Sequence, residues 1–67
     1  MLKANRLLAI MALFGDNHTT LAKKLNIGRP SLTKKINNKL NFKIPEIKKI
    51  KHMYHLTARD IEDIFFY

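Results

Sequence analysis

The sequence contains no cysteine, and this absence excludes a disulfide framework and a zinc site built on thiolates. A secreted domain of this size usually carries disulfides, so we expect a cytoplasmic protein. Long apolar runs are also absent. The longest, Leu7 to Phe14, has eight residues, whereas a membrane-spanning helix needs about 20. Lys3 and Arg6 precede this run as in a signal peptide, but no small-residue cleavage site follows, so we expect neither a signal peptide nor a membrane partner.

Acidic residues are scarce and unevenly placed. The chain has 5 Asp and Glu against 13 Lys and Arg, which gives a formal net charge of +8. No acid lies between Asn17 and Pro45. The same stretch carries the cations Lys23, Lys24, Arg29, Lys34, Lys35, Lys39 and Lys43. A central segment with cations alone indicates a polyanionic partner, and nucleic acid is the first candidate.

The length of 67 residues predicts one domain with little room for an enclosed catalytic cavity. His52 and His55 lie three apart, but no carboxylate or thiol nearby completes a metal site. Ser31 has no catalytic partners that the sequence reveals, and Glu62 and Asp63 are interpreted as solubilising charges. We therefore expect no enzyme activity, no cofactor, no bound metal and no small-molecule substrate.

Apolar spacing predicts an all-α fold of four to five short helices. The spacing of Leu7, Met11 and Phe14 is typical of one face of an amphipathic helix. The same kind of pattern predicts helices over 2–14, 18–25, 30–38 and 45–55, and a last one that begins at Thr57. The segment 40–44 alternates apolar and polar residues, but it is interpreted as a loop because it is short and ends at a proline.

Helix ends are marked by capping residues. Asn17 is a good N-cap for the second helix, and Thr57 with Asp60 predicts a reciprocal cap on the last one. The turn at 26–28 separates the second and third helices, and a turn of this length predicts a steep crossing of the helix-turn-helix kind. Pro30 suits a first helical turn and disfavours helical geometry for Arg29, which we therefore expect at the cap.

The central segment resembles the helix-turn-helix of phage Cro and repressor proteins. The matches, in order and spacing, are Leu21-Ala22, Ile27, Ser31-Leu32-Thr33 and Asn37-Asn38-Lys39. Pro45-Glu46-Ile47 and the ending from Leu56-Thr57 to Phe66 also resemble the five-helix domain of that family, so the resemblance covers nearly the whole chain. It implies a lambda-repressor-like DNA-binding domain over residues 1–67, with the helix-turn-helix at about 17–38, in a bacterial host cell.

The resemblance also implies contact residues. Side chains at the start of the third helix and one turn later would reach base edges: Arg29, Ser31 and Lys34, with Pro30 and Thr33 as lesser candidates. Helix ends and loops would hold phosphates, which points to Asn17, His18, Asn38, Lys39 and Lys43. Lys23, Lys24 and Lys35 are expected to face solvent alone. Pro30 departs from the family, whose members often carry a polar side chain there.

These observations lead to two functional hypotheses. The first is a phage-encoded, sequence-specific transcription regulator or repressor of the Cro type that binds double-stranded DNA. The second is an anti-repressor that acts by binding a phage repressor protein. Phe65, Phe66 and Tyr67 are candidates for a homodimer or partner interface, because a chain this small offers few partners for so many aromatic rings.

Overall fold

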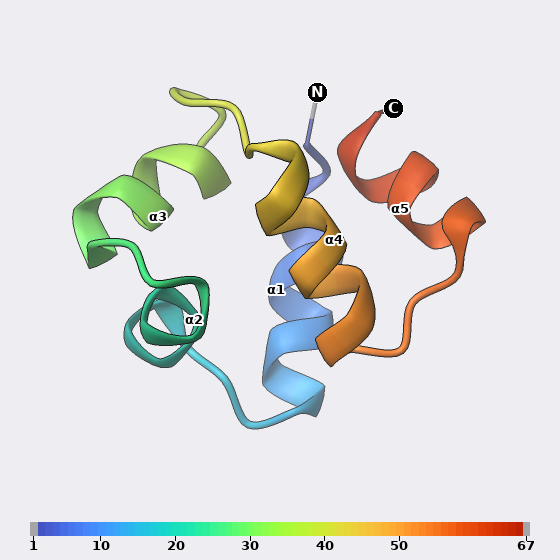
Figure 1. Ribbon diagram of the computed structural model, residues 1–67, viewed down its shortest axis with the longest axis horizontal. Coiled ribbons are helices and arrows are strands. Elements are labelled where there is room, and N and C mark those ends of the chain that lie inside the picture. Colours follow the sequence, from blue (N-terminus) through green and yellow to red (C-terminus); the bar gives the residue numbers. More distant parts are fainter. Residues whose placement is uncertain (1, 67) are drawn as a thin grey trace.

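Residues 2–66 are described by a computed structural model, and within this range the chain forms five short α-helices and no strand (Figure 1). The helices are α1 (Ala4–Leu13), α2 (His18–Leu25), α3 (Arg29–Ile36), α4 (Ile44–Met53) and α5 (Ala58–Phe65). The predicted all-α class is therefore confirmed for the described residues. Tyr67, one of the predicted interface residues, lies outside them.

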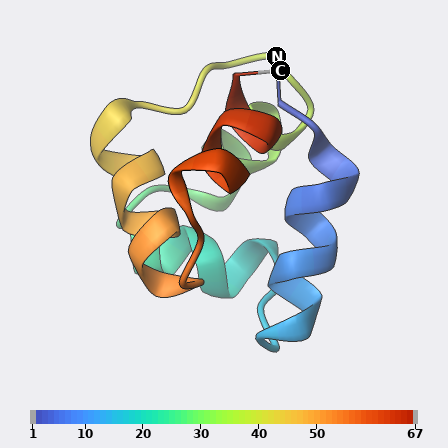
Figure 2. The same ribbon diagram turned by 90° about the vertical axis from the view of Figure 1, so that its right-hand side faces the viewer.

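The five helices surround a shared core. In Figure 1, α2 and α3 occupy one side of the molecule and α5 the other, with α4 and α1 between them. α2 is seen nearly end on while α3 lies across the view, so the two axes are steeply inclined, as the short turn predicts. Figure 2 shows α5 lying between α1 and α4. The Lys3 backbone N–H donates to the Ile64 carbonyl at 2.7 Å and joins the start of the chain to α5.

The core is made of the apolar stripes predicted from the sequence. Every helix contributes, and the buried side chains are Leu2, Leu7, Met11, Leu21, Ala22, Leu25, Leu32, Ile36, Ile47, Ile50, Tyr54, Ile61, Ile64 and Phe65. Phe14 was expected on the inner face of α1, and this prediction is wrong. The helix ends at Leu13, and the exposed Phe14 ring packs on Tyr54 with a centroid separation of 4.9 Å.

The ends of α2 follow the local sequence signals. The Thr20 backbone N–H donates to Asn17 Oδ1 at 2.9 Å, and the Asn17 N–H donates to Thr20 Oγ1 at 2.9 Å. Two N–H groups without a helical partner are thereby satisfied. At the other end, Asn26 adopts the left-handed conformation (φ 58°) that a short polar side chain tolerates. The predicted cap and turn are both confirmed.

The start of α3 differs from the expectation by one residue. Gly28 is the N-cap in extended geometry, and Arg29 is the first helical residue instead of the cap. The reason is that the Gly28 carbonyl already accepts the Leu32 N–H at 3.1 Å, so helical hydrogen bonding begins there. Pro30 is the second helical residue, where its missing N–H leaves no bond unmade.

Candidate nucleic-acid interface

The outward side of α3 carries most of the residues predicted to contact bases. Leu32 and Ile36 bury the opposite side of the helix in the core. Residues spaced i, i+3, i+4 and i+7 share one helix face, and this stripe holds Pro30, Thr33, Lys34 and Asn37. Arg29 and Ser31 are exposed in the first turn beside it. All five predicted base-contact residues thus lie on or next to one surface, although Thr33 is half-buried.

Asn37 is a candidate that the sequence interpretation did not single out. It is exposed at the C-cap of α3 and stands seven residues after Pro30, so it extends the outward stripe by one turn. Its amide can donate and accept hydrogen bonds at the same time, which a base edge requires. The spacing from Pro30 and Lys34 was the available signal.

The N-terminus of α2 is joined directly to α3. The ring Nδ1 of His18 is hydrogen-bonded to Thr33 Oγ1 at 3.0 Å, and both side chains are half-buried. His18, a predicted phosphate-contact residue, is therefore hydrogen-bonded to Thr33, a predicted base-contact residue. The bond leaves the Thr33 hydroxyl less available to a base and places the capped start of α2, at Asn17, beside the outer face of α3.

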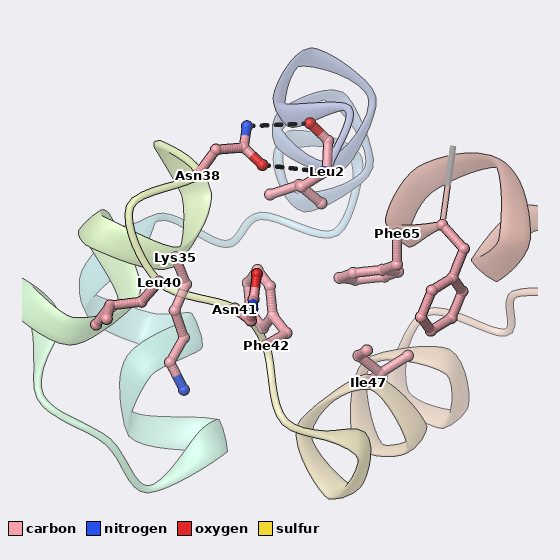
Figure 3. A pocket seen from close by; sticks show the side chains of 9 residues that line it. Leu2, Lys35, Asn38, Leu40, Asn41, Phe42, Ile47 and Phe65 are labelled. Atoms are coloured by element: carbon pink, nitrogen blue, oxygen red, sulfur yellow. Dashed lines mark hydrogen bonds between the residues drawn. The ribbon is translucent and has the colours of Figure 1, made fainter.

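Asn38, a predicted phosphate-contact residue, has a structural role in the fold. It takes the left-handed conformation (φ 62°) after α3, and its side chain is hydrogen-bonded to the backbone of Leu2 (Figure 3). The Leu2 N–H donates to Asn38 Oδ1 at 3.0 Å, and Asn38 Nδ2 donates to the Leu2 carbonyl at 3.2 Å. Both polar atoms of the amide are thus engaged. The bonds fix the end of α3 to the start of the chain.

Lys35 was expected to face solvent, and this prediction is wrong. Lys35 is only 6% exposed, and its Nζ donates to both carboxylate oxygens of Glu46 at 2.6 and 2.7 Å. Glu46 Oε1 also accepts the Lys43 N–H at 2.8 Å, which caps α4. Burial raises the pKa of the Glu46 carboxyl, but the bonds from Lys35 and Lys43 outweigh it and hold that pKa below its usual range. The pair ties the end of α3 to the start of α4.

Lys24 also has a partner that the sequence interpretation did not foresee. Its Nζ donates to the two carboxylate oxygens of Asp16 at 2.8 and 3.0 Å, although the lysine side chain stays half-exposed. Asp16 and Glu46 flank the α2–α3 segment in the sequence, and both carboxylates turn inward onto lysines. The acids nearest to α3 therefore add no negative charge to its outward face.

Lys39 and Lys43 remain exposed in the segment between α3 and α4. No carboxylate forms a salt bridge with either side chain within residues 2–66, although the Lys43 charge helps to lower the pKa of Glu46. Arg29 and Lys34 are likewise exposed on α3 and form no salt bridge in the same range. Exposed cations of this kind attract a phosphate backbone.

No family model, curated protein sequence or solved structure matches this chain. None of the helices that the structure describes is long and apolar enough to cross a membrane.

A hollow of about 340 Å³, lined by both polar and apolar side chains, lies between the 37–43 segment and the end of α5 (Figure 3). Phe42 and Phe65 meet edge to face inside it, with ring centroids 5.3 Å apart. Of the predicted interface residues, Phe65 is 7% exposed and belongs to the core, whereas Phe66 is 59% exposed. Phe66 and the exposed Leu40 both line the hollow, so each leaves apolar surface uncovered there.

Proposed function

We propose that the protein is a sequence-specific DNA-binding transcription regulator that places α3 in the major groove. The observation that supports it is the outward face of α3, which is exposed, polar and free of acidic side chains while its apolar side is buried. α2, the turn at 26–28 and α3 then act as a helix-turn-helix over about residues 17–38. The resemblance to phage Cro and repressor proteins supports the same function.

In this proposal the exposed side chains of α3 read base edges. Arg29 and Lys34 can donate to the O6 and N7 of guanine, and the Asn37 amide can pair with the N6 and N7 of adenine. The start of α2 and the cations after α3, Lys39 and Lys43, would bind the two phosphate strands beside the groove. Phosphate contacts set the position of the helix, and the base contacts carry the sequence preference.

Selection of bound duplexes from a random pool tests this proposal. We expect one sequence to be enriched, and we expect Lys34→Ala to weaken binding to it by about 5-fold to 150-fold, since one good base contact contributes about 1–3 kcal/mol. Fluorescence anisotropy with the selected duplex gives the affinities. Lys49→Ala, on the exposed side of α4, is the matched control and should keep the wild-type affinity. A pool without enrichment, or equal losses in the two variants, would contradict sequence-specific binding through α3.

The hollow beside the end of α5 supports a second candidate function, contact with a protein. Leu40 and Phe66 leave apolar surface uncovered in its lining. A second copy of the chain docked there would make a homodimer, which is the state that helix-turn-helix proteins use to bind two half-sites about one DNA turn apart. A phage repressor docked there would instead make the protein an anti-repressor.

Sedimentation at micromolar concentration tests the dimer. We expect the wild-type protein to associate, and we expect Phe66→Ala to shift it toward monomer because an exposed aromatic ring would leave the interface. Leu13→Ala removes another strongly exposed apolar side chain from α1 and serves as the control. A wild-type protein that stays monomeric both free and on DNA would contradict the dimer. DNA binding seen only beside a phage repressor would favour the anti-repressor.

A further inference from the structure

A second cationic surface lies on α4 and just after it. Lys48, Lys51, His52 and His55 line one open hollow of about 340 Å³ together with Leu56. Within α4, Lys48, Lys51 and His52 are spaced i, i+3 and i+4 and share one side of the helix, and His55, in the turn after α4, lines the same hollow. From Lys48 to His52 the stripe extends about 6 Å at 1.5 Å per residue before the turn at His55, long enough to face more than one phosphate of a strand.

No acidic side chain neutralises this α4 stripe. Glu46 is the acid of α4, and it is buried against Lys35. Neither Lys48 nor Lys51 is paired with a carboxylate in the part of the chain that the structure describes. The His55 ring contacts the Phe14 ring, with centroids 6.5 Å apart. The two lysines of the stripe therefore carry positive charge that no carboxylate within residues 2–66 neutralises through a salt bridge.

The α4 stripe faces away from α3. Glu46 marks the side of α4 that points toward α3, because it binds Lys35 there. At about 100° per residue, Lys48, Lys51 and His52 lie about 140° to 240° around the helix from Glu46, on its opposite side. The outward stripe of α3 in turn points away from its own buried Lys35. The two cationic surfaces thus lie on different sides of a molecule 27 × 24 × 21 Å in extent.

We propose that the α4 stripe binds the phosphate backbone of a second DNA segment, so that one copy of the protein bridges two duplexes. The inference rests on the proposed function of α3 for the first duplex. One straight duplex against α3 cannot also reach the far side of α4, which is why the second surface implies a second segment.

The chemistry of the α4 stripe favours nucleic acid over the other anionic partners. A helix that lies on a lipid surface inserts its own apolar face, but the apolar face of α4, with Ile47 and Ile50, is buried in the core. Protein interfaces are depleted in lysine, whereas the stripe carries Lys48 and Lys51 beside its two histidines. Phosphate backbones are bound by lysine without apolar contact.

A bridging assay tests the proposal. The selected duplex is fixed on beads, a labelled duplex of the same sequence is added, and the label captured by the protein is measured. We expect Lys48→Ala/Lys51→Ala to lose capture while keeping its affinity for the single selected duplex. Lys49→Ala/Arg59→Ala removes the same charge from exposed positions outside the stripe and should still bridge. Alanine is favourable in helices, and circular dichroism checks that both variants fold.

Three outcomes would overturn bridging through α4: capture by Lys48→Ala/Lys51→Ala at the wild-type level, equal loss in the control, or a parallel fall in affinity for the single duplex. A different variant detects failure of the proposed function. If α3 does not bind the duplex, Arg29→Ala/Lys34→Ala would leave the affinity for the selected duplex unchanged. Phosphate binding by the α4 stripe would still be visible as salt-sensitive binding that Lys48→Ala/Lys51→Ala removes.

Discussion

Replacing Glu46 by alanine is expected to leave a large fraction of the molecules unfolded near neutral pH. Lys35 would keep its position in the core without a partner, and removal of one member of a buried ion pair costs about 3–5 kcal/mol. The variant would also lose the acceptor for the Lys43 N–H that caps α4. Small domains fall at the low end of the usual range of about 5–15 kcal/mol for the free energy of unfolding, so little stability would remain.

Urea unfolding followed by circular dichroism measures this loss, and the double variant Lys35→Met/Glu46→Gln separates its causes. Methionine fills the space of the lysine stem without a charge, and glutamine keeps an acceptor for Lys43. Buried ion pairs can often be replaced by neutral side chains of similar size at little cost. We therefore expect the double variant to recover most of the stability. If the double variant unfolds as readily as Glu46→Ala, the unpaired charge of Lys35 is not the cause of the lost stability.

The ion pair also bears on the proposed function, because it is one of three polar links that join α3 to the rest of the molecule. Lys35 and Glu46 join the end of α3 to the start of α4, the amide of Asn38 fixes the next residues to Leu2, and His18 holds Thr33 from the side of α2. These three polar links come from three different parts of the chain. Together they hold the base-contact candidates outward.

Features set by near neighbours could be predicted from the sequence. The reciprocal caps of α2 and α5 join residues three apart, Asn17 with Thr20 and Thr57 with Asp60, so a short pattern specifies them. The left-handed turn at Asn26 and the apolar stripes of the helices are equally local. The all-α fold and the outward face of α3 follow from such signals.

The polar links of the site could not be predicted in the same way, because their partners are far apart in the sequence. Glu46 stands 11 residues after Lys35, and Asn38 stands 36 residues after its partner Leu2. Charge alone suggested an exposed Lys35. Its spacing of three residues from Leu32 was a signal that the lysine borders the core, but the partner that makes its burial possible depends on how α3 meets α4.

Asp16 is a further polar residue with a partner far away in the sequence, because Tyr54 stands 38 residues after it. Its side chain is 3% exposed and accepts bonds from Lys24 Nζ at 2.8 Å, Thr20 Oγ1 at 2.8 Å and the Tyr54 hydroxyl at 2.7 Å. It thus joins the α1–α2 segment, α2 and the end of α4. Burial raises the pKa of the Asp16 carboxyl, but the bonds from Lys24, Tyr54 and Thr20 outweigh it and hold that pKa below 3.8. Burial, together with the bond to Asp16, raises the pKa of Tyr54.

Asp16→Asn is expected to destabilise the protein by about 2–3 kcal/mol at pH 7, since hydrogen bonds to a charged group contribute about 1.5–3 kcal/mol and several are altered at once. The asparagine amide would also present N–H donors to the donors of Lys24 and Tyr54. Urea unfolding at neutral pH measures the loss. Asp63→Asn makes the same chemical change in the exposed pair with Arg6, whose atoms are 3.7 Å apart, and should stay within about 1 kcal/mol of wild type.

The pH dependence of the difference between Asp16→Asn and wild type identifies the charge as the cause. Because the pKa of Asp16 is lower in the folded than in the unfolded state, its contribution is complete above the ordinary value of 3.8 and is lost as the pH falls through the folded value. The wild-type protein should therefore lose stability toward about pH 3, while the variant lacks this part of the loss. The two curves of unfolding free energy should converge in acid. A difference that is the same at pH 7 and at about pH 3 would mean that Asp16 acts through shape and packing, not through its charge.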